Sequence, residues 1–289
     1  MDLFMKKTIK YFFQSIFIYL FILFAKIIGL KLSRKFFSLL FQKIGPLIRT
    51  NNIINKNLSK LPAQLSNREK KEIKLKMWSN YGMTFIEYFF LKNFKKNNLH
   101  IKIKGEAILN EIYKQDKPVI FVSGHFANFE LMSMEITKKK INLATIYRPL
   151  NNFFLNPLME YLRKKYVCKN QIKKGLGGVK EIISYINKKY SIALMIDQRV
   201  SEGEKIDFFN EKAFTTTLPA QIALKFDLDI VPIFIERKNN SFFSMHIYKP
   251  LKSSEFNDKL EITNKLNQIL ESMIIKNPSQ WIWTHDRWK

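Results

Sequence analysis

Cysteine and histidine are scarce in this chain, which has one cysteine and four histidines among 289 residues. Cys168 has no second cysteine with which to form an internal disulfide, so the chain suits a reducing compartment. The histidines are widely separated and show no metal-ligand spacing; they are His100, His125, His246 and His285. We therefore expect neither a disulfide framework nor a metal site.

Acidic residues are also few, since 24 Asp and Glu stand against 49 Lys and Arg, for a formal net charge of +25. Such an excess implies an anionic partner, which is nucleic acid, an acidic membrane or an acidic protein. Lysine is frequent along the whole chain, so part of the excess coats solvated faces. Charge alone does not choose among these partners.

Two common catalytic signatures are absent. The glycine-rich segment 173–178 (KKGLGG) forms neither a G-x-G-x-x-G fingerprint nor a P-loop, so a plain turn is favoured over a phosphate cradle. The segment 123–125 (SGH) is not G-x-S-x-G, which argues against a covalent serine intermediate.

A long apolar segment is present near the N-terminus. Residues Tyr11 to Ala25 are apolar or aromatic apart from Gln14 and Ser15, and lysines precede them. No small-residue cleavage site follows, so residues 1–30 are predicted to be an uncleaved membrane anchor rather than a signal peptide. Residues Lys31 to Lys43 continue as a basic amphipathic helix suited to an anionic headgroup layer, with a core helix bearing a solvated edge as the alternative.

Beyond this segment, residues 31–289 are predicted to form one large domain, because the length of the chain and its 46% hydrophobic content support a full core. A long helix is expected over Asn67 to Asn93, and strands and helices alternate after it. Strands are expected at 101–103, 119–122, 143–147, 192–196, 230–235 and 242–248, with helices around 130–138, 154–165, 178–188, 219–226 and 256–276. The pattern predicts an α/β fold with a mostly parallel central sheet covered by helices.

The segment from Pro118 to Glu130 reads PVIFVSGHFANFE and carries the clearest chemistry. Its apolar run predicts a buried strand, so His125 lies in the following loop and Glu130 in the first turn of the next helix, with Asn128 as a plausible N-cap. A histidine held in one tautomer by a carboxylate can take a proton from a hydroxyl. The pair therefore indicates acyl transfer to an alcohol, with a structural histidine as the alternative.

Two further strands are expected to end in polar residues, Arg148 after one and Asp197 with Gln198 after the other. Ligands of parallel sheets gather at the carboxyl ends of strands, so these residues are candidates for substrate binding. Arg148 offers a planar fork for a phosphate.

These segments together resemble the lipid A late acyltransferases, within the wider His-x4-Asp/Glu glycerolipid acyltransferase group. The resemblance covers nearly the whole chain: Asn57-Leu58 and Leu61-Pro62, WSNYG at 78–82 with Glu87, GHFANFE at 124–130, YRPLNN at 147–152, MIDQ at 195–198, DFF at 207–209, TTT at 215–217 and WIWTHDRWK at 281–289. Asn210, where a glycine is usual, and Asp286, in a tail that is usually more basic, depart from the family pattern.

The resemblance implies an enzyme of the bacterial inner membrane, with its catalytic domain on the cytoplasmic face. It would move a fatty acyl chain from acyl carrier protein to a hydroxyl of an anionic lipid A precursor, with His125 and Glu130 as the catalytic pair and no cofactor. It also links the arginine at position 148 to substrate binding; Asn128, Asp197 and Gln198 are further candidates. A lysophospholipid or a mannosylated lipid is the alternative acceptor, and a non-catalytic basic protein that binds membrane or nucleic acid is the alternative from another class. We expect no nucleic-acid partner, because an apolar N-terminus argues against movement on nucleic acid.

Overall fold

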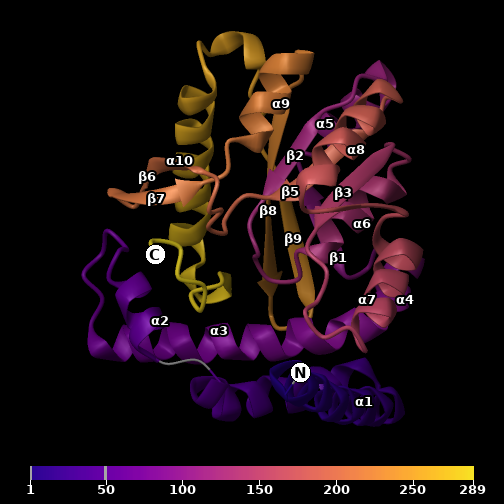
Figure 1. Ribbon diagram of the computed structural model, residues 1–289, viewed down its shortest axis with the longest axis vertical. Helices are drawn as coiled ribbons and strands as arrows, with labels where there is room; N and C mark the ends of the chain where they lie inside the picture. Colours follow the sequence, from indigo (N-terminus) through magenta and orange to yellow (C-terminus); the bar gives the residue numbers. More distant parts are fainter. Residues whose placement is uncertain (1, 49–50) are drawn as a thin grey trace.

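The computed structural model describes residues 2–48 and 51–289, and a seven-stranded sheet forms its centre (Figure 1). The strand order is β1-β9-β8-β2-β5-β3-β4, and every neighbouring pair is parallel except β8 and β9. The strands are β1 (Ile101–Lys104), β2 (Ile120–Ser123), β3 (Leu143–Tyr147), β4 (Asn170–Lys173), β5 (Ser191–Met195), β8 (Ile230–Lys238) and β9 (Phe242–Ile247). The predicted fold class, a mostly parallel sheet flanked by helices, is confirmed.

Helices connect the strands and cover the sheet. They are α5 (Glu106–Gln115), α6 (Glu130–Lys138), α7 (Asn156–Leu162) with a π-helical turn (Arg163–Val167), α8 (Leu176–Asn187), α9 (Leu218–Phe226) and α10 (Lys259–Lys276). The connections β1–α5–β2 and β2–α6–β3 run in one direction along the strand order, whereas β4–α8–β5 and β5–α9–β8 run in the other. Connections between parallel strands are right-handed as a rule, so α5 and α6 lie on one face of the sheet and α8 and α9 on the opposite face.

The central strand β2 is buried along its whole length, with Ile120 and Phe121 fully inaccessible. A strand covered on both faces needs apolar residues at successive positions, which explains the unbroken apolar run in the sequence. The residue after the strand is Gly124, where a side chain has no room because a Cβ there would lie 2.7 Å from Phe126 and 3.0 Å from Leu270. The glycine lets the chain turn tightly into the loop that carries His125.

Helix α3 (Asn67–Glu87) runs across one end of the sheet, and the N-terminal helix α1 (Asp2–Ile48) lies on its far side (Figure 1). Ser66 caps α3 with a capping box, in which its side chain accepts from the Glu69 N–H. Three short helices complete this end: α2 (Asn51–Leu58), a 3₁₀ turn (Tyr88–Phe90) and α4 (Leu91–Lys96). The long helix predicted over 67–93 therefore exists, but it changes pitch after Glu87.

Helix α1 contains the predicted anchor. Among the helices of the described residues, it is the one that is long and apolar enough to cross a membrane, over Met5–Leu47. Its backbone is not helical at Gly29, where φ is 74° and ψ is 170°. The division of the chain at residue 30 stays a prediction, and Met1 lies outside the described residues.

A small antiparallel hairpin projects beside α10, formed by β6 (Glu204–Phe208) and β7 (Glu211–Thr215). Its turn residues Phe209 and Asn210 both have positive φ, 54° and 60°. Asparagine is among the few residues other than glycine that adopt this conformation readily, so Asn210 fits the turn despite its departure from the family pattern.

Candidate active site

His125 lies in the loop after β2 and contacts a carboxylate from the neighbouring strand. Its Nδ1 atom is 2.7 Å from Oδ1 of Asp197, and its backbone N–H donates to Oδ2 of the same residue over 2.7 Å. Ser123 and Met195 pair in register at the ends of β2 and β5, so the residues two positions further on lie side by side. The Nε1–H of Trp281 also donates to Asp197 Oδ2, at 2.9 Å.

This contact sets the protonation chemistry of the pair. Burial lowers the pKa of His125, but the negative charge of Asp197 and its hydrogen bond raise it more, so the net shift is upward. Burial raises the pKa of Asp197, whereas His125 and the bonded N–H groups lower it, with a net shift downward. Asp197 is therefore ionised and accepts the Nδ1 proton, which leaves Nε2 as the basic nitrogen.

Glu130 is the first residue of α6, as expected, but its hydrogen bonds go elsewhere. Its Oε1 atom accepts from Arg163 Nε at 2.9 Å and from the Tyr88 hydroxyl. The hydrogen bond that orients His125 is thus made with Asp197 and not with Glu130. The physical reason is that the mostly buried Arg163 binds this carboxylate. The charge of Glu130 still contributes to raising the pKa of His125.

Asn128 does not cap α6, whose N-cap position is occupied by Phe129 without a side-chain cap. The Asn128 side chain instead donates to Glu87 Oε2 at 2.9 Å. Glu87 is fully buried between Arg34 and Arg237, and these arginines hold its pKa below the ordinary value against the opposing effect of burial. Asn128 therefore ties the loop that carries His125 to α3.

The same loop is held at a second point. Ala127 has a positive φ of 43°, and its carbonyl accepts from Thr84 Oγ1 at 3.0 Å while its N–H donates to the Gln280 carbonyl at 3.2 Å. A left-handed alanine costs energy and persists only where its surroundings fix it. These contacts fix the position of His125 relative to α3 and the C-terminal segment.

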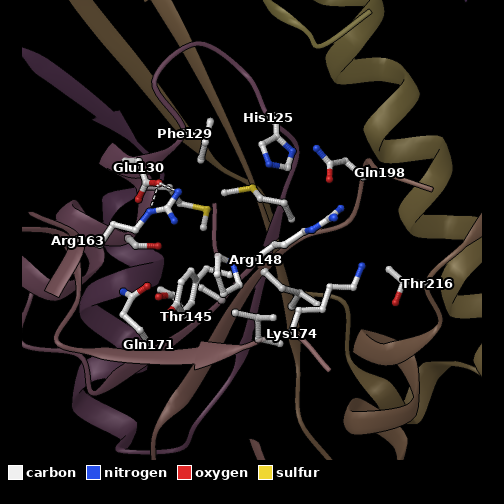
Figure 2. Close-up of a pocket in the computed structure, with 18 of the residues that line it drawn as sticks. His125, Phe129, Glu130, Thr145, Arg148, Arg163, Gln171, Lys174, Gln198 and Thr216 are labelled. Atoms are coloured by element: carbon white, nitrogen blue, oxygen red, sulfur yellow. Dashed lines mark hydrogen bonds and ion pairs between the residues drawn. The ribbon is translucent and has the colours of Figure 1, made fainter. Parts of the chain in front are cut away.

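A cavity of about 450 Å³ with both polar and apolar walls lies in front of His125. We call it the cationic cavity, because basic side chains from strand ends and the π turn line it: Arg148, Lys174 and Arg163. Tyr147 and Lys173 pair in register in β3 and β4, so Arg148 and Lys174, one residue further on, are neighbours. Figure 2 shows Arg148 extending between Lys174 and His125, with Gln198 near the imidazole. Glu130 neutralises Arg163, which leaves Arg148 and Lys174 as the cations available to an anion.

A second, mostly apolar cavity of about 600 Å³ meets the first at His125, and Phe129 and Arg163 line both. Its apolar walls come from α1, α3 with the 3₁₀ turn after it, and α7: Ile18, Phe41, Phe85, Phe89, Leu158 and Met159. These walls are far apart in sequence, so no local pattern predicts the cavity. One side of His125 thus suits an anionic group and the other a hydrocarbon chain.

No group of three or more His, Cys, Asp and Glu side chains is placed to hold a metal ion within residues 2–48 and 51–289. Cys168 is buried, and burial raises the pKa of its thiol to about 11, so it is not a thiolate at neutral pH.

Comparison with known proteins identifies the family. A model of the bacterial lipid A biosynthesis acyltransferases matches residues 5–289. The chain is 22% identical to a lipid A biosynthesis lauroyltransferase of Escherichia coli K12 over 247 residues, which cover 83% of this chain and 79% of the relative. It is also 22% identical to a palmitoleoyltransferase of the same organism over the same coverage, and 23% identical to an acyltransferase of Haemophilus influenzae over 86% of this chain and 79% of the relative. The chain belongs to the bacterial lipid A biosynthesis acyltransferase family, and it is an acyltransferase.

Proposed function

We propose that this enzyme transfers a fatty acyl chain from acyl carrier protein to a hydroxyl of a lipid A precursor, with His125 as the general base. The observation that carries the proposal is the position of His125, held by Asp197 at the junction of a cationic cavity and an apolar one. The family supports late acylation in lipid A synthesis.

In the proposed reaction, Nε2 of His125 takes the proton from the acceptor hydroxyl while its oxygen attacks the thioester carbonyl carbon. The tetrahedral intermediate collapses, the C–S bond breaks, and the departing thiolate receives the proton from the imidazolium. The products are the acyl ester and the free thiol. The thioester supplies the driving force.

Asp197 has a different role from the substrate binding that the sequence suggests, because both of its oxygens contact His125. It fixes the tautomer and stabilises the imidazolium that forms during transfer. Glu130 lies in the wall of the cationic cavity, where its charge adds to this stabilisation.

Arg148 and Lys174 are the groups we assign to a phosphate of the acceptor, and Gln198 is placed to contact its polar headgroup. A guanidinium binds phosphate in a bidentate manner, whereas an ammonium acts as a point charge. The apolar cavity takes the acyl chain of the donor. The same division of cavities would also serve a lysophospholipid, which has one phosphate and one hydroxyl, so the acceptor must be tested directly.

We also propose that the enzyme acts at the bacterial inner membrane with its domain in the cytoplasm. The single buried cysteine fits a reducing compartment, and the apolar helix α1 fits membrane association. Acyl carrier protein as an acidic donor would be attracted by the net charge of +25.

A panel of acceptor lipids with one acyl donor tests the proposal. Purified enzyme is incubated with acyl carrier protein thioester and, separately, a tetra-acylated lipid A precursor, a lysophospholipid or a mannosylated lipid, and the products are weighed by mass spectrometry. We expect one added acyl chain on the lipid A precursor. Preferential acylation of either other lipid would assign the enzyme to that acceptor instead.

A further inference from the structure

The N-terminal helix is folded back on itself at Gly29. The rings of Phe21 and Phe37 lie 5.7 Å apart, and those of Phe24 and Phe36 lie 5.2 Å apart. Sixteen residues of straight helix would separate the first pair by about 24 Å. Ser33 Oγ also reaches back to the carbonyl of Ala25 at 3.1 Å. Residues 2–28 and 30–48 are therefore two arms of a helical hairpin, which we call the first and second arm.

We propose that this hairpin lies along the membrane within one leaflet of an anionic bilayer and does not cross it. The inference goes beyond the identification of α1 as an anchor, and it is independent of which lipid the enzyme acylates.

The first arm is fastened to the catalytic domain near its N-terminal end. Asn152 Nδ2 donates to the carbonyl of Tyr11 at 3.0 Å, and Ser15 Oγ bonds to Asn152 Oδ1 at 3.1 Å. One turn further on, the Tyr19 hydroxyl donates to the Phe154 carbonyl at 3.2 Å. These contacts bind the arm to the loop that follows Arg148.

The first arm is also fastened near the Gly29 turn. Lys26 Nζ donates to the carbonyl of Phe89 and lies 4.3 Å from the centre of the Phe90 ring. Between Tyr11 and Lys26 the arm runs about 23 Å along the domain. A membrane-crossing helix must leave its soluble domain, and this arm would have to break contacts at both ends to do so.

The second arm is packed just as closely against α3. Arg34 Nε lies 2.6 Å from Glu87 Oε1, and Ser38 Oγ lies 2.7 Å from Ser79 Oγ. At Gly82 any side chain would collide with the backbone carbonyl of Phe37. The first turns of α3 read NREKKE, so a hairpin standing across the bilayer would carry these charges into hydrocarbon.

By length and composition α1 could cross a membrane, but the uncharged stretch of its first arm is shorter than the hydrocarbon core of a bilayer. Lys10 and Lys26 bound the apolar residues Tyr11 to Ala25. Fifteen helical residues cover about 23 Å, whereas the hydrocarbon core of a bilayer is about 30 Å thick.

The exposed surface of both arms is what a lipid leaflet requires. Large apolar side chains are exposed on the first arm, including Phe13, Phe17, Leu20 and Ile27, and on the second arm, including Leu32, Phe36 and Leu39. Lys31, Lys35 and Lys43 are exposed among those of the second arm. Such a face matches acyl chains and anionic headgroups together, whereas in contact with a second copy its lysines would repel one another.

The placement has a consequence for substrate access. Ile18 of the first arm and Phe41 of the second arm both line the apolar cavity that reaches His125. With the hairpin in the leaflet, this cavity lies at the depth of the acyl chains, so a lipid hydrocarbon chain need not pass through water.

Cysteine labelling tests the topology. The sole cysteine, buried Cys168, is replaced by Ser, and single cysteines are placed by Lys7→Cys and Lys31→Cys near the two ends of the first arm. Lys180→Cys, on an exposed part of α8, reports the side of the catalytic domain. A membrane-impermeant maleimide is applied to sealed inverted vesicles and to spheroplasts. We expect all three cysteines to react from the same side. Reaction of either Lys7→Cys or Lys31→Cys from the side opposite Lys180→Cys would overturn the proposal.

Depth measurement keeps the proposal testable if one of these variants folds poorly. Spin labels at Phe13, Phe17, Leu20 and Ile27 are measured by EPR in vesicles of phosphatidylethanolamine and phosphatidylglycerol. We expect similar depths at all four positions. A maximum in the middle with shallow ends would show a crossing helix, and dipolar coupling between copies with no lipid exposure would show a dimer; either result would overturn the proposal. Neither readout uses activity, so a failed acylation assay would leave the result in force.

Discussion

Asp197 holds the backbone N–H of His125 with one oxygen and the imidazole Nδ1 with the other, each over 2.7 Å. The two contacts fix both the position of the loop and the orientation of the ring. Trp281 binds the same carboxylate from the C-terminal segment. The imidazole is thus held by a residue at the end of the adjacent strand β5, and the C-terminal segment holds that residue in turn.

The pH dependence of catalysis follows from this pair. His125 must be neutral to accept a proton, and its pKa is raised, so kcat/KM should fall as pH decreases through a midpoint above the ordinary histidine value. Asp197→Asn should lower kcat by a factor of about 10² to 10⁴ and move the acid limb to lower pH, because the charge that raises the pKa is gone. Rate measurements from pH 5 to 9 check both effects. Asp207→Asn, which alters an exposed carboxylate in β6, is the matched control, and an unshifted limb in Asp197→Asn would contradict the role of this pair.

Glu130 should behave differently from Asp197. Glu130→Ala leaves the mostly buried Arg163 without its carboxylate, and breaking such a pair on one side costs about 3 kcal/mol or more in the free energy of unfolding. Urea unfolding measures this loss, and Glu130→Met with Arg163→Met should recover part of the stability because no unpaired charge remains. Activity should fall in Glu130→Ala, but the acid limb should move less than in Asp197→Asn. A shift at least as large would give Glu130 the direct role that the sequence suggests.

The sequence predicts the fold well where its signals are local. The apolar runs of β2, β3 and β8 and the periodic segment of α6 are recognisable within a few residues. Strand β4 (NQIK) is not among the predicted strands, since a short, polar edge strand has no apolar run. The hairpin strands β6 and β7 (EKIDF and EKAFT) are charged on their exposed faces and are missed for a similar reason.

The site is harder to predict because its partners meet through the sheet. His125 and Glu130 are five residues apart, and their spacing favours a local pair. Recognition of Asp197 as the partner requires the strand order, in which β5 lies beside β2 in a definite register. Lys174 is likewise hidden, since its segment suggests a plain turn until β4 is placed next to β3.

Arg148 and Lys174 should govern the use of a phosphorylated acceptor. Arg148→Ala should raise the KM for the acceptor by one to two orders of magnitude, as expected for loss of a charge-assisted contact of about 1.5–3 kcal/mol, with a smaller effect on the donor KM. Arg148→Lys should restore only part of the loss, because lysine lacks the bidentate fork. Lys174→Ala should act in the same direction. Lys180→Ala removes an exposed lysine of α8 and should leave both constants unchanged; unchanged acceptor kinetics in Arg148→Ala would place the phosphate elsewhere.

The apolar cavity should set the length of the acyl chain. Ile18→Trp adds bulk to the wall supplied by α1 and should shift donor preference toward shorter chains, because the longest chains no longer fit. Competition among acyl carrier protein thioesters of different lengths, read by mass spectrometry, measures the shift. Phe17→Trp makes a similar change at an exposed neighbouring position and should leave the preference as it is. An equal shift in both variants would mean that the cavity does not hold the acyl chain.

The most direct test of the account compares wild-type enzyme with His125→Ala on a tetra-acylated lipid A precursor and an acyl carrier protein thioester, with the product weighed by mass spectrometry. The imidazole is the only group that we assign to proton removal, so the wild-type enzyme should add one acyl chain and the variant none above background, although both remain membrane-bound and equally stable. Comparable acylation by His125→Ala, or no acylation by the wild-type enzyme of a precursor that other family members accept, would contradict the account.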